Sequence, residues 1–362
     1  MFDVTPMVSA TVDGGALRHN LQLVRQWAPK SRVMAVIKAN AYGHGLVAVA
    51  RALESTDAFA VARVDEGLKL REAGIRTPTV LLEGVFDREQ LDAAASAGFE
   101  LVVHTNEQVE LLRAAEPGMS FKVWLKLDTG MNRLGFKGVA FDRALAALRA
   151  LPVVQLPVNL FTHLACADAP ELPATKDQLS LFDAATHALP GEKSLENSAA
   201  MLSFPEAQAD WVRPGLLLYG VSPFAGAVGA DYGLKAVMTL QSHVIALKTL
   251  SPGEKVGYGG DWTARRTTRL AVAAVGYGDG YPRNLASGTP VLVNGERAGL
   301  AGRVSMDMIG IDVTDLKGSL KLGDTVVLWG EGLPVEEVAV WAQTIPYELL
   351  CGISQRVAVT LR

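Results

Sequence analysis

Residues Val33-Met34-Ala35-Val36-Ile37-Lys38 form an apolar run that ends in a lysine, and Leu46–Ser55, a segment with helical periodicity, follows it. Runs that are apolar at nearly every position are typical of strands covered on both faces. The same unit recurs up to about residue 220. The further apolar runs are Ala58–Ala62, Thr79–Leu82, Leu101–His104, Val123–Leu127, Val158–Leu164 and Leu216–Tyr219, and the helical segments between them are Val64–Ala73, Arg88–Ala97, Glu107–Ala115, Phe141–Leu151 and Gln178–Leu189.

About eight such units over roughly 200 residues favour a parallel (β/α)8 barrel. An open, doubly wound parallel sheet is the alternative, because the order of the strands in a sheet cannot be read from the sequence. In a barrel of this kind the carboxyl ends of the strands carry the active site.

The pattern changes beyond about residue 235, where β-branched or alternating runs are separated by Gly-, Asn- and Asp-rich turns. These runs are Thr239–Lys248, Leu270–Val275, Pro290–Val293, Met308–Val313 and Thr325–Trp329, and a helical stretch, Val335–Thr344, follows them. Such a composition predicts a mainly-β domain. We therefore expect a (β/α)8 barrel over residues 1–235 and a C-terminal, mainly-β domain over residues 236–362.

Composition excludes several classes of protein. The chain has 362 residues, of which 49% are hydrophobic, and a net charge of −4. This charge argues against a nucleic-acid partner, and no apolar stretch is long enough to predict a membrane span. The first 15 residues do not resemble a signal peptide, and the only cysteines, Cys166 and Cys351, suit a reducing compartment. We expect a cytoplasmic protein, and the scattered histidines predict no metal site.

Lys38 is the first candidate for chemistry. A lysine at the carboxyl end of a barrel strand points into the mouth of the barrel, and partial burial disfavours its charged form. The alternative is a lysine that extends its amine to solvent at the rim. Tyr42 and His44 follow in a glycine-containing turn, which favours a site.

The segment Val36–Gly45 resembles the pyridoxal-phosphate attachment motif of the alanine racemase family, and the resemblance runs the length of the chain. Segments that match the family in order are Trp124–Gly135, Phe161–His163, Asn197–Ala200, Val212–Gly215, Tyr219–Gly220, Val256–Gly259, Gly276–Arg283, Gly302–Asp307 and Pro346–Glu348. Matches in order across both predicted domains make the resemblance specific.

The resemblance implies that Lys38 forms a Schiff base with pyridoxal 5'-phosphate and that Tyr258 is the second base. Two bases on opposite faces of the substrate are needed to invert a carbon. Free tyrosine titrates near 10, and the resemblance assigns its tuning to His163. It also implies a head-to-tail homodimer in which Tyr258 enters the site of the other subunit. From the residue alone, Tyr258 would more simply pack between two sheets.

The family also implies roles for other residues. Arg213 would face the pyridine nitrogen, which an always-protonated guanidinium cannot protonate; the alternative is a surface arginine paired with an acid. The implied phosphate and cofactor contacts are Tyr42, Ser198, Gly215, Leu216 and Tyr347, although Ser198 could equally be the N-cap of a helix at Ala199–Leu202.

Arg133 and the main chain of Met306 would contact the substrate, and otherwise Arg133 is a solvated loop residue. Lys126 matches a lysine that is carbamylated in many members, and its alternative is an ion pair with Asp128 or Asp307. Two positions depart from the family pattern: Glu196, where a small residue is usual, and Ala358, where many members have proline.

We expect an alanine racemase activity, which interconverts L- and D-alanine and serves peptidoglycan synthesis or alanine catabolism. Three alternatives remain: a racemase of broader specificity (serine, lysine or arginine), a pyridoxal-phosphate decarboxylase, and a non-enzymatic pyridoxal-phosphate carrier. Arg213 argues against the decarboxylase, which would offer an acid to the pyridine nitrogen. A carrier would not need the second domain that supplies Tyr258.

Overall fold

Eight parallel strands close into a barrel in the structure, a computed structural model that describes residues 6–362. The first of them, β2, pairs with both the second and the last strand, through Met34 with Ala58 and through Arg32 with Trp211. The predicted (β/α)8 barrel is therefore confirmed, and the open sheet is excluded. The barrel strands are β2 (Arg32–Val36), β3 (Ala58–Val61), β4 (Thr79–Leu81), β5 (Phe99–Val103), β6 (Val123–Lys126), β7 (Asn159–Phe161), β8 (Lys193–Asn197) and β9 (Trp211–Arg213).

The last two barrel strands differ from the sequence prediction. Leu216–Tyr219, expected as the final strand, is a turn of 3-10 helix, while β8 and β9 supply the strands. Both were missed because charged residues, Lys193, Glu196 and Arg213, interrupt the apolar runs by which a buried strand is recognised. Glu196 and Arg213 lie at or near the carboxyl ends of their strands, on the mouth side of the barrel, whereas Lys193 begins β8 at the opposite end.

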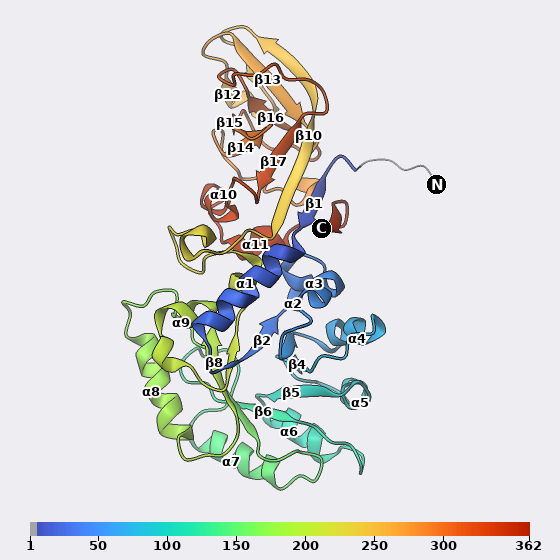
Figure 1. Ribbon diagram of the computed structural model, residues 1–362, viewed down its shortest axis with the longest axis vertical. Coiled ribbons are helices and arrows are strands. Elements are labelled where there is room, and N and C mark those ends of the chain that lie inside the picture. The colour runs from blue at the N-terminus through green and yellow to red at the C-terminus, as the bar shows by residue number, and fades with distance from the viewer. Residues whose placement is uncertain (1–5) are drawn as a thin grey trace.

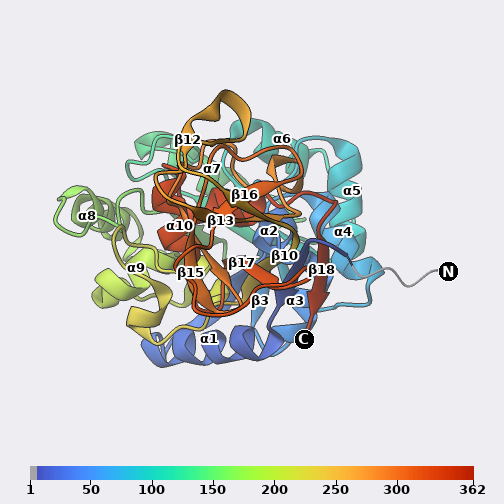
Figure 2. The ribbon, with the colours of Figure 1, turned by 90° about the horizontal axis from the view of Figure 1, so that it is seen from above.

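Helices surround the barrel, as the view from above shows (Figure 2). They are α1 (Gly14–Trp27), α3 (Leu46–Ala52), α4 (Val64–Glu72), α5 (Arg88–Ala97), α6 (Asn106–Arg113), α7 (Gly138–Arg149), α8 (Ala174–Thr186) and the short α9 (Ser198–Ser203). Helix α1 was not predicted, although it begins with a standard cap: Asp13 Oδ1 accepts a hydrogen bond from the Ala16 N–H at 2.9 Å. None of the helices in residues 6–362 combines the length and apolar content that a membrane span requires.

The C-terminal lobe is built on one sheet with the strand order β13-β16-β15-β14-β17-β10-β1-β18 (Figure 1). Its strands are β10 (Met238–Leu250), β13 (Thr268–Ala273), β14 (Pro290–Val293), β15 (Glu296–Leu300), β16 (Ile309–Asp312), β17 (Thr325–Trp329) and β18 (Ala358–Leu361). A small hairpin, β11 (Lys255–Val256) and β12 (Trp262–Thr263), and two helices, α10 (Val335–Trp341) and α11 (Pro346–Cys351), complete it. The predicted mainly-β domain is confirmed.

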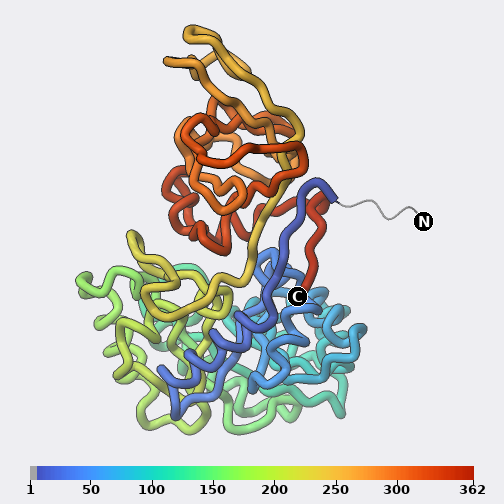
Figure 3. Tube along the Cα trace, turned by 45° about the horizontal axis from the view of Figure 1, so that its top comes forward, coloured from blue at the N-terminus to red at the C-terminus, as the bar shows by residue number. Residues whose placement is uncertain are grey.

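The N-terminal strand β1 (Ser9–Val12) belongs to this second sheet and not to the barrel. It pairs antiparallel with β10 and parallel with β18, and its residues alternate between buried and half-buried. The described part of the chain therefore begins in one lobe, crosses to the other at α1 and returns at β10 (Figure 3). Residues 1–235 thus include a strand of the second domain, which a contiguous division could not anticipate; residues 1–5 lie outside the described part. The boundary at 235/236 itself stays a prediction.

The second lobe reaches the barrel mouth through α11. This helix packs on the turn after β2, where a Cβ at Gly43 would lie only 2.1 Å from the Leu350 carbonyl oxygen. Gly43 also has a φ of +80°, which favours glycine. Helix α11 therefore supplies one wall of the mouth.

Candidate functional site

A cavity of about 440 Å³ opens at the carboxyl ends of the barrel strands. Lys38 lies on its wall, two residues after the end of β2, as its strand position predicted. Burial and the charge of Arg133 lower the pKa of the Lys38 amine below its ordinary value. The other predicted site residues that line this cavity are Tyr42, Lys126, Arg133, His163, Ser198, Arg213, Gly215, Leu216 and Tyr347.

The backbone after Lys38 is a left-handed turn. Ala39, Asn40, Ala41 and Tyr42, which make up most of the element α2 (Lys38–Tyr42), all have φ between +52° and +54°. Non-glycine residues rarely adopt this conformation, which costs about 1–2 kcal/mol per residue. Hydrogen bonds hold the turn in place: Asn40 Oδ1 accepts from the Leu46 N–H at 2.9 Å, and the Ala41 N–H donates to the Ile37 carbonyl at 2.9 Å. Such strain is characteristic of functional sites.

Tyr42, Ser198, Gly215 and Tyr347 form one corner of the cavity. The Tyr42 ring stands 5.8 Å from the Tyr347 ring, and a Cβ at Gly215 would lie 2.5 Å from Tyr42 Oη. Ser198 Oγ accepts a hydrogen bond from the Gly215 N–H at 2.8 Å. Backbone N–H groups and hydroxyls of this kind suit an anion.

Ser198 is not the helix cap that was considered as an alternative. The N-cap of α9 is Asn197, whose Oδ1 accepts from the Ala200 N–H at 3.0 Å. Ser198 is the first helical residue, and its buried hydroxyl faces the chain after β9 instead.

Arg213 lies at the end of β9 and is 3% exposed, so the alternative of a surface arginine is wrong. Its Nη1 donates to Ser194 Oγ at 2.6 Å, and its Nη2 donates to the carbonyls of Thr162 and Leu195 at 2.8 and 3.0 Å. Desolvation lowers the pKa of Arg213 to about 9, which still leaves it protonated at neutral pH. The structure thus holds a cation in a fixed orientation at the cavity wall.

His163 contacts Arg213 rather than an acid. Nδ1 of His163 lies 3.3 Å from Arg213 Nη2, and since a guanidinium can only donate, this nitrogen accepts. Burial and then the charges of Arg213 and Lys126 hold the pKa of His163 well below its usual value. His163 is therefore neutral at pH 7.

Lys126, on β6, is 6% exposed and has no carboxylate within ion-pair distance among residues 6–362. The expected alternative partners are engaged elsewhere, Asp128 with Lys137 at 3.5 Å and Asp307 with Arg356 at 2.8 Å. Desolvation and then the charge of Arg213 lower the pKa of the Lys126 amine to about 8.

Arg133 is exposed and points into the same cavity from the loop after β6. The loop is shaped by Asp128, whose Oδ1 accepts from the N–H groups of Gly130 and Asn132, both at 3.0 Å. Arg133 is therefore a solvated loop residue, as the alternative had it, and a cavity residue as well.

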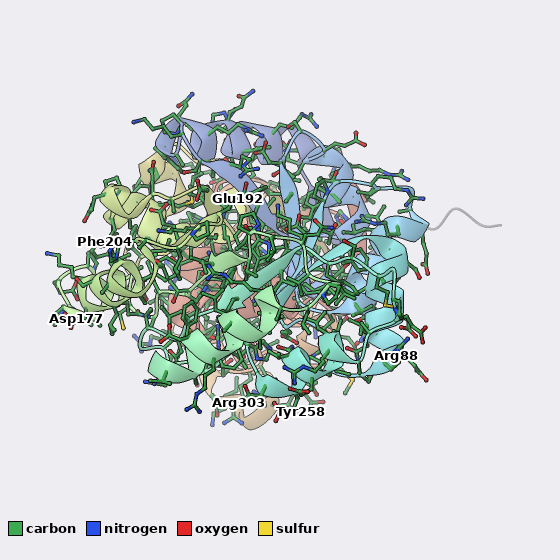
Figure 4. The ribbon with its side chains drawn as sticks, turned by 90° about the horizontal axis from the view of Figure 1, so that it is seen from below. Arg88, Asp177, Glu192, Phe204, Tyr258 and Arg303 are labelled. Atoms are coloured by element: carbon green, nitrogen blue, oxygen red, sulfur yellow. The ribbon has the colours of Figure 1, made fainter. Side chains whose placement is uncertain are left out.

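Two predicted site residues do not line the cavity. Tyr258 lies in a turn (Tyr258–Gly260) between β11 and β12 with 70% of its surface exposed, and Met306 is 53% exposed. Figure 4 shows Tyr258 at the periphery of the chain. Tyr258 therefore does not pack between sheets, and within one chain it does not meet Lys38 or His163.

Sequence reasoning missed several residues at this site. Phe161 lies under Arg213, with its ring centre 4.0 Å from the guanidinium carbon, and Glu83 and Cys351 line the cavity. Glu66, on α4, accepts a hydrogen bond from the Ala39 N–H at 2.6 Å. Phe161 and Glu83 closely follow or end barrel strands, a position that could have identified them, whereas nothing in the sequence connects Glu66 with Ala39.

The departure at Glu196 produces a buried carboxyl group. Glu196 is fully buried on β8, and neither of its oxygens has a hydrogen-bond partner within residues 6–362. Burial raises the pKa of this carboxyl group to about 8. Glu196 is thus uncharged at neutral pH, near the cation of Arg213.

Comparisons with known proteins agree with this geometry. Residues 12–223 match the family model described as alanine racemase, N-terminal domain, and residues 237–361 match that of the C-terminal domain. The alanine racemase of Nitrosococcus oceani is 52% identical over 353 residues, which cover 97% of this chain and 98% of that protein.

Solved structures give the same result. The crystal structure of a biosynthetic alanine racemase from Pseudomonas aeruginosa has a TM-score of 0.94 and 44% identity, with 99% of each chain covered. An alanine racemase from Bartonella henselae with covalently bound pyridoxal phosphate has a TM-score of 0.89 and 29% identity, covering 99% of this chain and 100% of that one. Matches of this extent over both lobes show that the chain belongs to the alanine racemase family.

Proposed function

We propose that this protein is an alanine racemase, which interconverts L- and D-alanine with pyridoxal 5'-phosphate at the barrel mouth. The observation that carries the proposal is that one cavity brings together Lys38, the fixed cation of Arg213, and the corner formed by Tyr42, Ser198 and Gly215. These groups come from both ends of the barrel sequence. Membership in the family of pyridoxal-phosphate isomerases supports it.

The cavity residues fit this cofactor. An amine of lowered pKa suits a covalent link to an aldehyde, and the corner of hydroxyls and backbone N–H groups suits a phosphate. Tyr42 Oη approaches Gly215 so closely that residue 215 can carry no side chain. Because glycine has none, the corner stays open to a ligand. We assign the covalent link to Lys38, the phosphate to Tyr42, Ser198, Gly215, Leu216 and Tyr347, and the pyridine nitrogen to Arg213.

Bound pyridoxal phosphate withdraws electrons from the α-carbon of an amino acid and so makes its hydrogen acidic. Lys38 Nζ takes or returns that proton on one face, because burial lowers its pKa and so favours the neutral amine that acts as a base. Arg213 stays protonated and offers no acceptor, so it limits how far the ring withdraws electrons. We infer that this restraint favours racemisation over transamination and decarboxylation.

The second proton carrier is Tyr258, whose Oη serves the opposite face. Because Tyr258 is exposed and absent from the cavity of its own chain, we infer a head-to-tail homodimer in which it completes the site of the other subunit. Other exposed apolar residues support an interface on this lobe: Tyr277, Met306 and Met308 are 41%, 53% and 47% exposed. His163, held neutral by Arg213, would then face Tyr258, and Arg133 and the Met306 main chain would contact the substrate.

We also propose that Lys126 is carbamylated. Its amine is buried, lacks an anionic partner among the described residues, and has a pKa of about 8, so a fraction is neutral and nucleophilic. Addition of CO₂ forms an N–C bond and releases one proton, which leaves an anion among Arg213 and Arg133. Incorporation of ¹³C-bicarbonate should give a carbamate signal by NMR that Lys126→Met lacks, and an unlabelled wild-type protein would refute the modification.

The product suits peptidoglycan synthesis, and the reverse reaction suits alanine catabolism. Both cysteines are free, Cys166 half-buried and Cys351 exposed, which agrees with a cytoplasmic location. We assign to this protein the reaction that both roles share.

The decisive experiment is incubation of the protein and pyridoxal phosphate with single enantiomers of alanine, serine, lysine and arginine in deuterium oxide. We expect alanine to racemise fastest, with deuterium entering at the α-carbon. Lys38→Ala should remove the absorbance of the lysine-bound cofactor. Tyr258→Phe should retain that absorbance and lose racemisation in both directions, while α-deuteration persists for the enantiomer whose hydrogen Lys38 removes. Release of CO₂, or deuteration without inversion, would refute the proposal. Faster racemisation of another amino acid would make that amino acid, and not alanine, the preferred substrate.

A further inference from the structure

Glu66 bridges two segments that form the wall of the cavity next to Lys38. Its Oε1 accepts a hydrogen bond from the Ala39 N–H at 2.6 Å, and its Oε2 accepts from the Ala62 N–H at 2.8 Å. Ala39 and Ala62 both line the cavity, on the turn after β2 and directly after β3. One carboxylate thus fastens the left-handed turn to the end of the neighbouring strand.

Helix capping explains only part of this arrangement. Glu66 is the third residue of α4, and Oε2 also accepts from the N-cap residue, Arg63, at 3.4 Å, as a capping-box glutamate does. A cap needs no contact with a residue 27 positions earlier in the chain. The short bond to Ala39 therefore serves the turn, whose positive φ values require support.

We propose that Glu66 is a positioning residue for Lys38: its carboxylate fixes the strained turn that begins with Ala39 and so sets where the Lys38 amine stands in the cavity. This inference rests on the proposed function of Lys38. Glu66 does not line the cavity, so it acts through Lys38 and touches no ligand itself.

The charge of Glu66 adds a second, separable effect. Burial and the cation of Arg133 lower the pKa of Lys38, while the carboxylates of Glu83 and Glu66, and Cys351, raise it. Removal of the Glu66 charge therefore makes the ammonium form less stable and moves the titration of Lys38 to lower pH. A purely structural residue would not shift this midpoint.

The first test measures hydrogen exchange of the Ala39 amide in the full chain, with and without pyridoxal phosphate. Glu66→Gln keeps one acceptor oxygen for the three N–H donors, Ala39, Ala62 and Arg63, and places an NH₂ group where the second carboxylate oxygen stood. We expect exchange at Ala39 to rise by about 10- to 100-fold, the effect of losing one charge-assisted hydrogen bond. Asp65→Asn is the matched control, because it removes a charge from the same first turn of α4 without contacting Ala39.

The second test measures how fast borohydride traps pyridoxal phosphate on Lys38 of the cofactor-free chain, as a function of pH. Glu66→Gln should lower the plateau rate and shift the midpoint to lower pH. Glu66→Asp, which keeps the charge but falls short by one methylene, should lower the plateau and leave the midpoint in place. Asp65→Asn should change neither.

The outcomes separate this inference from the proposed function. If Glu66→Gln leaves the Ala39 exchange and the trapping plateau unchanged, Glu66 does not position Lys38. If the wild-type chain is not labelled at Lys38 at all, the proposed function fails, while the exchange at Ala39 still decides whether Glu66 holds the turn. If Glu66→Gln lowers the melting temperature so far that the chain is unfolded in the assay, Glu66→Asp, which retains the carboxylate, takes its place.

Discussion

Arg213 Nη2 lies 3.3 Å from His163 Nδ1, and this single contact fixes the protonation of the histidine. An arginine nitrogen can only donate, so Nδ1 must accept and any ring hydrogen resides on Nε2. A second proton on His163 would place two cations against each other in a buried site. The pair therefore presents a neutral imidazole to whatever enters the cavity.

Replacement of Arg213 should change both the histidine and the reaction. Arg213→Gln removes the charge that lowers the pKa of His163, so this pKa should rise, and NMR should show the ring titrating at higher pH than in the wild type. We expect racemisation to fall by about 10²-fold, typical of losing a preorganised electrostatic group, with more pyruvate formed per turnover. Arg143→Gln, on the exposed face of α7, is the control. Unchanged partitioning between the two products would contradict the role of Arg213.

In the left-handed turn, replacement of alanine by glycine should affect stability in the opposite sense to the same replacement in a right-handed helix. Ala39 is exposed at φ +53°, so Ala39→Gly relieves an unfavourable backbone conformation, whereas Ala146→Gly, at an exposed position within the right-handed helix α7, should cost about 1 kcal/mol. We expect the free energy of unfolding in urea to be higher for Ala39→Gly than for Ala146→Gly by about 1–2 kcal/mol. Equal losses in the two variants would mean that the turn is not left-handed in solution.

Glu196 should make the protein less stable as the pH rises. Its folded-state pKa, about 8, lies above the ordinary value of 4.5, so the folded chain binds more protons than the unfolded chain between these values. Stability is therefore lost as the pH rises through this window, by up to about 1.4 kcal/mol per pH unit. Below the ordinary value both states are protonated and no penalty remains.

Denaturation of Glu196→Met in urea from pH 5 to 8 tests this effect. The stability of the variant relative to the wild type should increase steadily with pH, because methionine has a similar volume and no charge. Glu54→Met, at an exposed position that does not contribute to the raised pKa of Glu196, should show no such trend. A pH-independent difference for Glu196→Met would show that the carboxyl group finds a partner in solution.

The fold could be predicted from the sequence where burial is two-sided and apolar. The strands from Val33 to Leu164 were located because a barrel interior and a ring of helices leave few polar positions in them. The prediction failed at β8 and β9, where Ser194 and Arg213 bond to each other across the sheet and break the apolar pattern. The residues that hide a strand are thus the ones that build the site.

The site was predictable to the extent that it follows the chain locally. Lys38 was located from its place at the end of a strand, and the family motif supplied Tyr42, Arg213 and Ser198. Contacts between distant elements were not predictable: the bond from Ala39 to Glu66 depends on how α4 docks against the turn. The placement of Tyr258 likewise depends on how the second lobe sits on the barrel.

Subunit mixing tests whether Tyr258 serves another chain. If each site combines Lys38 of one subunit with Tyr258 of the other, a heterodimer of Lys38→Ala and Tyr258→Phe subunits has one intact site and one that lacks both residues. With random exchange of equal amounts, half of the dimers are heterodimers, so racemisation should recover to about one quarter of the wild-type rate. Each variant alone should remain inactive in both directions, because proton removal and proton return each need one of the two bases.

The matched control mixes the wild type with a chain that carries both substitutions. Here every heterodimer has two incomplete sites, so activity per wild-type subunit should fall to about one half as subunits exchange. Were Lys38 and Tyr258 to act within a single chain, the first mixture would recover nothing and the second would lose nothing. Only for a head-to-tail dimer does the activity of the first mixture rise while that of the second falls. An assay of D-alanine formation during subunit exchange measures both changes.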